Sequence, residues 1–246
     1  MTPDPEEFDW THESPRISVE PTDDPWRLDF ADIASEPIHH RNYAVRAFRL
    51  SPEQFLIRGV VDDRKNGAAW VPWDPTPLVI HHMILDLVVD YPSLVIASAT
   101  AAMEVHPHEI CHHIAPKYDL LEGVSIARGF THKVREAFGG PKGCTHVTAL
   151  LQAMAPVAMQ ATWAMSTADR QAAAAADGFD VEHELLPVPS PTDQVAGAMR
   201  SLNTCHVFDE DGPYVTGLRQ GIPTPLPVTI KRRYARHGLL GERRSE

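Results

Sequence analysis

Residues 139–165, GGPKGCTHVTALLQAMAPVAMQATWAM, run from a glycine-rich turn into a long apolar segment. From Val147 to Met165, apolar residues recur at steps of three and four, which is the spacing of one face of an α-helix. Pro156 lies inside this segment, and a proline in a helix interior bends the helix about one turn earlier. The sequence therefore predicts a main helix over residues 144–165, around which the rest of the chain is organised.

Cys144 and His146 stand where the glycine-rich turn meets this helix. The unpaired N–H groups at a helix start favour negative charge, so a cysteine there is stabilised as the thiolate. The thiolate is the form of cysteine that acts as a nucleophile or binds a metal. We therefore predict that the chemistry is centred on this junction, with Cys144 as nucleophile or metal ligand and His146 as base or ligand.

Four segments upstream of the main helix have the composition of strands, and short turns or loops join them. They cover residues 43–50, 54–63, 77–89 and 94–105. Consecutive strands joined in this way favour an antiparallel meander over β-α-β units. The predicted fold class is therefore α+β, with a four-stranded antiparallel meander followed by helices packed on one face.

Further helices are predicted on both sides of the main helix. They cover residues 107–115, 125–138, 167–177 (with Thr167 as N-cap) and 194–202. Residues 203–216 are predicted as a strand and a tight turn, and the rest of the chain as irregular. The resulting division is an acidic extended arm (1–36), an α+β core (37–177) and an irregular C-terminal extension with a basic tail (178–246).

Composition excludes several classes of function. The net charge of −11 disfavours nucleic-acid binding, and eleven acidic residues against two basic ones lie in residues 1–36. No apolar run is long enough to span a membrane, and the acidic N-terminus does not resemble a secretory signal. Three cysteines fit a reduced cytoplasm. The standard glycine-rich phosphate loops are absent, so no nucleotide cofactor is expected.

The cysteines and histidines suggest a metal site. Cys111, Cys144 and Cys205 each lie near a predicted element boundary, and His146 and His206 are close to two of them. If these junctions converge, Cys111, Cys144, His146 and Cys205 form a ligand set suited to zinc or iron. The alternative is that each cysteine is a small buried hydrophobic residue.

Each of the other candidate site residues has two interpretations. Alternation along residues 77–89 places His81 on the core side, either as a hydrogen-bonded core histidine or as part of the site. Residues 108–112 match the zinc-protease pattern H-E-x-x-H, although a surface histidine cluster is favoured in a chain with 14 histidines. Trp70 and Trp73 form either a small satellite core or the wall of a substrate pocket.

Several motifs resemble one family. LLEGVSIARGF (120–130), the G-C-T-H run ending at His146, His81-His82-Met83 and N-T-C-H (203–206) resemble the uncharacterised bacterial domain-of-unknown-function family 2889. This resemblance implies a role in the catabolism of aromatic or steroid-like compounds.

The order of elements is also similar, more distantly, to the scaffold proteins of iron–sulfur cluster assembly. That resemblance implies a site of His81 or His82 with Cys111, Cys144 and His146. The first scaffold cysteine has no counterpart, because no cysteine precedes Cys111.

The function expected from these observations is that of an enzyme acting on a small, mainly apolar molecule. Cys144, His146 and His81 would carry the chemistry, and Trp70 and Trp73 would line the substrate pocket. The expected cofactor is zinc or iron, and the sequence is compatible with a homo-oligomer. Two alternatives are a non-catalytic zinc, iron–sulfur or sulfur-handling scaffold and a structural or partner-binding module.

Overall fold

A computed structural model describes residues 38–127, 129–181, 191–222 and 227–238. The chain divides into two compact units at Ala176/Asp177, and each is described by itself. The predicted acidic arm falls outside the described residues. Within the described residues, no helix combines the length and the apolarity needed to cross a bilayer.

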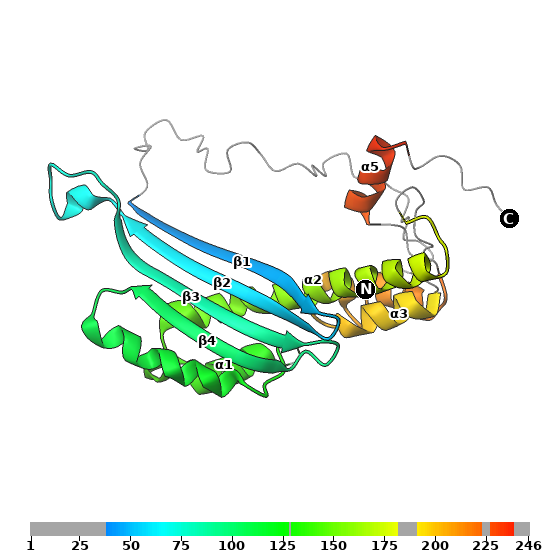
Figure 1. Cartoon of the computed structure of the whole chain (residues 1–246), viewed down its shortest axis with the longest axis horizontal. Helices are drawn as coiled ribbons and strands as arrows, with labels where there is room; N and C mark the ends of the chain where they lie inside the picture. Colours follow the sequence, from blue (N-terminus) through cyan, green and yellow to red (C-terminus); the bar gives the residue numbers. More distant parts are fainter. Residues whose placement is uncertain (1–37, 128, 182–190, 223–226, 239–246) are drawn as a thin grey trace. The chain divides into compact units, whose positions relative to one another are not determined.

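The first unit is built on a four-stranded sheet with strands in the order β1-β2-β3-β4, and every neighbouring pair is antiparallel (Figure 1). The predicted meander is therefore confirmed, and with it the α+β class. The strands are β1 (His39–Ser51), β2 (Gln54–Lys65), β3 (Leu78–Asp90) and β4 (Ile96–Val105).

One face of the sheet is buried because apolar residues alternate along its two central strands. The buried set comprises Phe55, Ile57 and Val61 in β2 and Met83, Leu85, Leu87 and Val89 in β3. Successive side chains of a strand point to opposite faces, so this spacing of two commits one face to the core.

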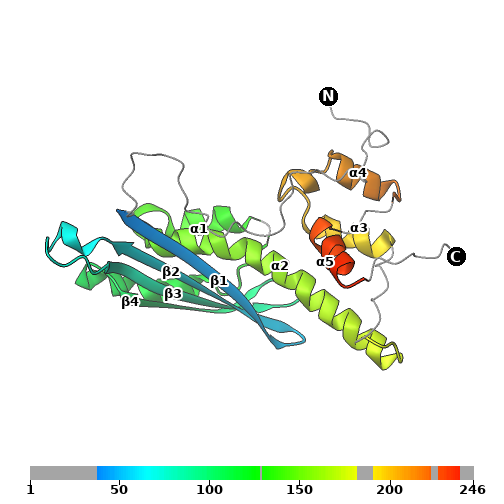
Figure 2. The same cartoon turned by 90° about the horizontal axis from the view of Figure 1, so that it is seen from above.

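Helix α2 (Thr145–Ala176) crosses this face and packs on β1 and β2 (Figure 2). Its apolar stripe includes Val147, Leu150, Leu151, Met154 and Ala158, all fully buried. Gly59 in β2 permits the close approach, because a Cβ there would lie 2.7 Å from Met154 Sδ. The predicted main helix is thus the element that covers the sheet.

Two further helices complete the layer on the same face. The 3₁₀ helix η2 (Glu109–Leu121) packs on β4, and α1 (Phe130–Phe138) packs on α2. Tyr118 of η2 stacks on Phe138 of α1, with ring centroids 4.8 Å apart. The short 3₁₀ helix η3 (Gly140–Lys142) leads into α2, and η1 (Gly67–Ala69) lies in the β2–β3 loop.

Three predicted helix boundaries were wrong. The helix predicted over 107–115 is a 3₁₀ helix that continues to Leu121 through Pro116. The helix predicted over 125–138 begins only at Phe130, because Gly129 before it adopts a left-handed conformation (φ 73°). The separate helix predicted over 167–177 does not exist: α2 continues through Thr167, since the alanine-rich sequence beyond it has high helix propensity.

The second unit contains α3 (Pro191–Arg200), η4 (His206–Phe208), α4 (Pro213–Arg219) and α5 (Val228–Arg236). The predicted helix near residues 194–202 is confirmed as α3. The strand predicted within 203–216 was wrong: Pro213 occupies the first position of a helix, where its missing N–H costs nothing. The prediction of irregular structure beyond it was also wrong, since residues 228–236 form α5.

Candidate active site

Asp63, near the end of β2, is the buried carboxylate at the centre of the site. Its side chain is 0% exposed, and it continues the alternation of Ile57 and Val61 toward the helices. Arg41 donates to both carboxylate oxygens, from Nε to Oδ1 at 2.5 Å and from Nη2 to Oδ2 at 2.5 Å. His81 Nδ1 lies 3.0 Å from Oδ2.

The sheet register brings these three groups together. Arg41 in β1 pairs with Asp63 in β2, and Asp63 pairs with His81 in β3. Directly paired residues on neighbouring strands point to the same face, so all three side chains lie under the helices. A register shift follows at once, between Asp63 and Arg64.

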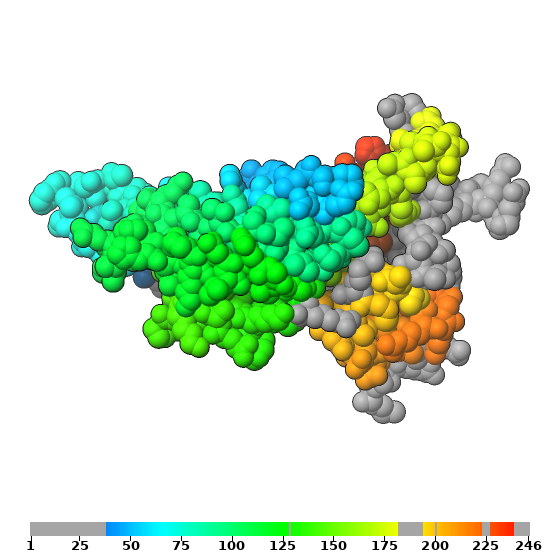
Figure 3. All heavy atoms as spheres, turned by 60° about the horizontal axis from the view of Figure 1, so that its bottom comes forward, coloured from blue at the N-terminus to red at the C-terminus, as the bar shows by residue number. Residues whose placement is uncertain are grey.

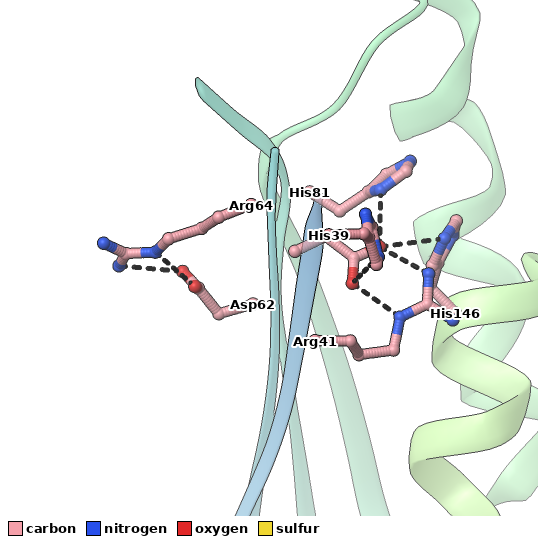
Figure 4. Close-up of polar contacts among 7 residues, drawn as sticks. His39, Arg41, Asp62, Arg64, His81 and His146 are labelled. Atoms are coloured by element: carbon pink, nitrogen blue, oxygen red, sulfur yellow. Dashed lines mark hydrogen bonds and ion pairs between the residues drawn. The ribbon is translucent and has the colours of Figure 1, made fainter. Parts of the chain in front are cut away.

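His146 reaches the same carboxylate from the first turn of α2 (Figure 4). Its Nε2 is 3.4 Å from Asp63 Oδ2, and its ring centroid is 3.7 Å from that of His81. His39 Nε2 approaches the other oxygen, Oδ1, at 3.5 Å. Three imidazoles and one guanidinium therefore surround a single buried carboxylate.

Cys144 lies directly before α2, and its thiol contacts His146. The Sγ atom is 3.7 Å from His146 Nδ1 and 3.9 Å from Met83 Sδ. The Cys144 carbonyl accepts the first helical hydrogen bond from Thr148 N–H, and the Cys144 N–H donates to the Tyr118 hydroxyl at 3.0 Å. His146 thus has the thiol at one ring nitrogen and the Asp63 carboxylate at the other.

The surroundings fix the charges of the central groups. Burial by itself would raise the pKa of Asp63, but the hydrogen bonds and charge of Arg41 and the hydrogen bond from His81 lower this pKa to about 2. Burial lowers the pKa of His146, as do the nearby His81 and Arg41, while Asp63 opposes them. Near neutral pH the site therefore holds an ionised carboxylate and a neutral His146.

Tyr118 supports the backbone at Cys144. Burial raises the pKa of its phenol to about 12, so the hydroxyl stays protonated. The hydroxyl is thus fixed as a hydrogen-bond partner for the residue that precedes α2.

A second pair of aspartate and histidine lies on the opposite face of the sheet. Asp62 accepts a hydrogen bond from Arg64 at 2.6 Å, and Asp62 Oδ2 lies 3.0 Å from His82 Nδ1. Figure 4 shows Asp62 and Arg64 pointing away from His81 and His146. His82 Nε2 is 3.5 Å from Glu104, and all four groups are at least partly exposed.

Of the residues predicted for the site, the structure brings Cys144, His146 and His81 together. Cys111 lies in η2, and Cys205 is exposed and precedes η4 in the second unit. Among the described residues, one group of three potential metal ligands has its ligand atoms within 4.8 Å of one another: Asp63, His81 and His146. His146 is the only member of the predicted metal set that belongs to this group.

The H-E-x-x-H match does not form a zinc-protease site. His108 and His112 lie at the start of a 3₁₀ helix, where residues four apart are rotated by about 120° and do not share a face. Both are exposed, and the ring of His112 contacts those of His106 and His113 at centroid distances of 5.7 and 4.3 Å. This agrees with the interpretation as a surface histidine cluster.

Trp70 and Trp73 lie in the loop that joins β2 to β3 and protrudes at one end of the unit (Figure 3). Their exposed fractions are 59% and 85%, so the interpretation as a satellite core was wrong. The loop leaves β2 two residues after Asp63 and enters β3 three residues before His81. A role in substrate binding stays a prediction.

Asp63 and Arg41 were not among the residues predicted for the site. The signal for Asp63 was present, because residues 55, 57, 59, 61 and 63 share the buried face of β2. A carboxylate on that face requires a partner of opposite charge. Arg41 becomes that partner only once the register of β1 is known.

A family model described as "Protein of unknown function (DUF2889)" matches residues 39–160, about half of the chain. The matched residues include Asp63, His81, Cys144 and His146. No curated protein and no solved structure matches the chain. The likeness to iron–sulfur scaffold proteins stays a prediction.

Proposed function

We propose that this chain, which belongs to the DUF2889 family, is an enzyme that uses Cys144 as a nucleophile on a small, mainly apolar molecule. The observation that carries the proposal is the position of His146, 3.7 Å from the thiol and 3.4 Å from the buried carboxylate of Asp63. A thiol, an imidazole and a carboxylate in that order form the relay of cysteine nucleophiles.

In this proposal each group has one task. His146 Nδ1 takes the proton of the Cys144 thiol, while Nε2–H donates to Asp63. The carboxylate fixes the tautomer of His146 and stabilises the imidazolium that forms. The low pKa of Asp63 and the lowered pKa of His146 keep both groups in the forms that the relay needs.

The reaction class that fits this relay is acyl transfer from an ester or thioester. The thiolate sulfur bonds to the carbonyl carbon, and the carbonyl π electrons move to the oxygen. The N–H groups of the first turn of α2, which have no partner within the helix, stabilise that oxyanion. The oxyanion then re-forms the carbonyl and expels the alkoxide or thiolate, which takes the proton from His146. Water activated by His146 then hydrolyses the acyl-cysteine.

The β2–β3 loop supports the proposal that the substrate is apolar. Trp70, Val71 and Trp73 present apolar surface to solvent there, on the loop whose ends adjoin Asp63 and His81. The family resemblance implies aromatic or steroid-like compounds, and tryptophan side chains bind the flat faces of such molecules.

The proposal is tested by competitive alkylation of the full chain with limiting iodoacetamide, followed by peptide mass spectrometry. Cys205 is exposed and Cys144 is partly buried, so accessibility alone predicts that Cys205 reacts first. The relay predicts that Cys144 reacts at least ten times faster than Cys205. A Cys144 that reacts more slowly than Cys205 contradicts the proposal.

Hydrolysis of p-nitrophenyl acetate and p-nitrophenyl benzoate provides the second readout. We expect turnover that prefers the benzoate and is lost in Cys144→Ser. Cys205→Ser is the matched control, because it removes an exposed thiol from the other unit and should leave turnover unchanged. Equal turnover in both variants argues against Cys144 as the nucleophile.

A further inference from the structure

The proposed thiol mechanism assigns no step to His81. Its Nδ1 lies 3.0 Å from Asp63 Oδ2, and His146 Nε2 lies 3.4 Å from the same oxygen. Two imidazole nitrogens thus converge on one carboxylate oxygen from two different elements, β3 and α2.

These separations match those between the ligands of a metal ion. Zinc bonds to nitrogen and oxygen of about 2.0–2.2 Å place neighbouring tetrahedral donors about 3.3 Å apart. The observed 3.0 and 3.4 Å bracket that value, and the ligand atoms of all three residues lie within 4.8 Å of one another. We propose that Asp63, His81 and His146 bind one Zn²⁺ ion, and that the bound ion removes His146 as the base of the Cys144 relay.

The rest of the site suits a reversible metal ion. Arg41 donates to both oxygens of Asp63, from Nε to Oδ1 and from Nη2 to Oδ2, and so orients the carboxylate as an outer partner orients a metal ligand. Its positive charge also opposes a cation, so binding is weaker than at an all-cysteine structural site. The side chains of His81 and His146 are 14% and 20% exposed, which leaves a path for the ion and a fourth position for water.

The switch follows from the tautomers of His146, and this part rests on the proposed function. For the relay, Nε2 carries the proton toward Asp63, and Nδ1 is free to accept the thiol proton. For zinc binding, the Nε2 lone pair goes to the metal, and Nδ1 carries the proton and faces Cys144 Sγ. A neutral imidazole has one N–H, so the two states exclude each other.

Zinc binding is measured by equilibrium dialysis of the full chain, carrying no polyhistidine tag, against ZnCl₂. We expect one equivalent in the unmodified chain and at least a tenfold weaker affinity in His81→Ala and in His146→Ala. His82→Ala is the matched control, because His82 neighbours His81 and makes the same 3.0 Å contact with an aspartate on the opposite face. Circular dichroism verifies that each variant is folded.

Three results overturn the zinc site. The first is undiminished binding in folded His81→Ala. The second is loss of binding in His82→Ala, and the third is loss of binding in His112→Ala from the surface histidine cluster. Cys144→Ser should still bind one zinc ion. Loss of zinc binding in this variant would show that the thiol is a ligand, and would overturn the set of Asp63, His81 and His146.

The switch has its own readout, the turnover of p-nitrophenyl benzoate with ZnCl₂ or with a chelator. Zinc should slow turnover at least tenfold, because zinc-bound His146 cannot accept the thiol proton, and the chelator should restore the rate. In His81→Ala the rates with and without zinc should agree within twofold. Zinc that binds without slowing turnover overturns the switch. If Cys144 reacts with iodoacetamide more slowly than Cys205 when the chelator is present, the proposed function is refuted and the zinc site still stands.

Discussion

Asp62–His82 and Asp63–His81 are the same pair of residue types in the same sheet register, on opposite faces. Both pairs have an oxygen-to-nitrogen distance of 3.0 Å, and both carboxylates also bind an arginine. Asp63 is fully buried beneath α2, whereas Asp62 and its partners are at least partly exposed. The comparison shows that the two pairs differ in their burial and neighbours, and not in their local geometry.

The two faces of the sheet differ in three ways. The low dielectric strengthens the interactions of Asp63 and makes an unpaired charge there costly. The helix adds His146 to the inner pair and places Cys144 beyond it. On the outer face water screens the charges, so the ion pairs there contribute little. The following predictions test this contrast.

The largest expected effect is on stability, when each carboxylate loses its arginine. Arg41→Ala leaves Asp63 buried without its main partner and should lower the free energy of unfolding by about 3 kcal/mol. This loss is at the low end for a broken buried ion pair, because Arg41 is itself partly exposed. Arg64→Ala on the outer face should change it little. Urea unfolding followed by circular dichroism measures both, and equal losses would contradict the contrast.

The next effect concerns the thiol. His146→Ala should slow alkylation of Cys144 about 100-fold, the range for loss of a positioned base. His82→Ala should leave the rate within twofold, because His82 faces away from the helices. Cys205 in the same sample serves as the internal standard. A rate for Cys144 that does not respond to His146→Ala would mean that the imidazole does not act on the thiol.

The pH dependence of stability should reflect Asp63. Its pKa falls from the ordinary 3.8 to about 2 in the folded chain, so its contribution is fully present above pH 4 and is lost as the pH falls to 2. The contribution is on the order of 2 kcal/mol. The unfolding free energies of the native chain and Asp63→Asn should therefore converge across that window, and a constant difference would contradict it.

The smallest effect is expected at the tryptophan loop. Trp70→Ala and Trp73→Ala should raise KM for p-nitrophenyl benzoate about threefold to tenfold, and leave kcat and the unfolding midpoint nearly unchanged, because both side chains are exposed. Loss of kcat at constant KM would instead indicate that the loop acts on the relay.

Much of the fold was predictable from short-range pattern. Alternation in β2 and β3 gave the sheet, and the repeat of three and four from Val147 to Met165 gave α2. The same helix start identified Cys144 and His146. These features depend only on residues close in sequence.

The rest required knowledge of distant partners. Asp63 gains its role from the register with Arg41 and His81 and from α2, none of which a local pattern encodes. Cys205 lies in the other unit, so its place in the ligand set stays a prediction. The boundary expected at Thr167 was wrong because the composition on both sides is equally helical.

The most direct test of the account is a double-mutant cycle on the alkylation rate of Cys144, using His146→Ala, Asp63→Asn and the double variant. If Asp63 acts on the thiol through His146, Asp63→Asn slows the reaction severalfold when His146 is present and has no further effect when it is absent. The double variant then reacts as slowly as His146→Ala alone. Two effects that multiply would show that the carboxylate and the imidazole act separately, and would contradict the relay.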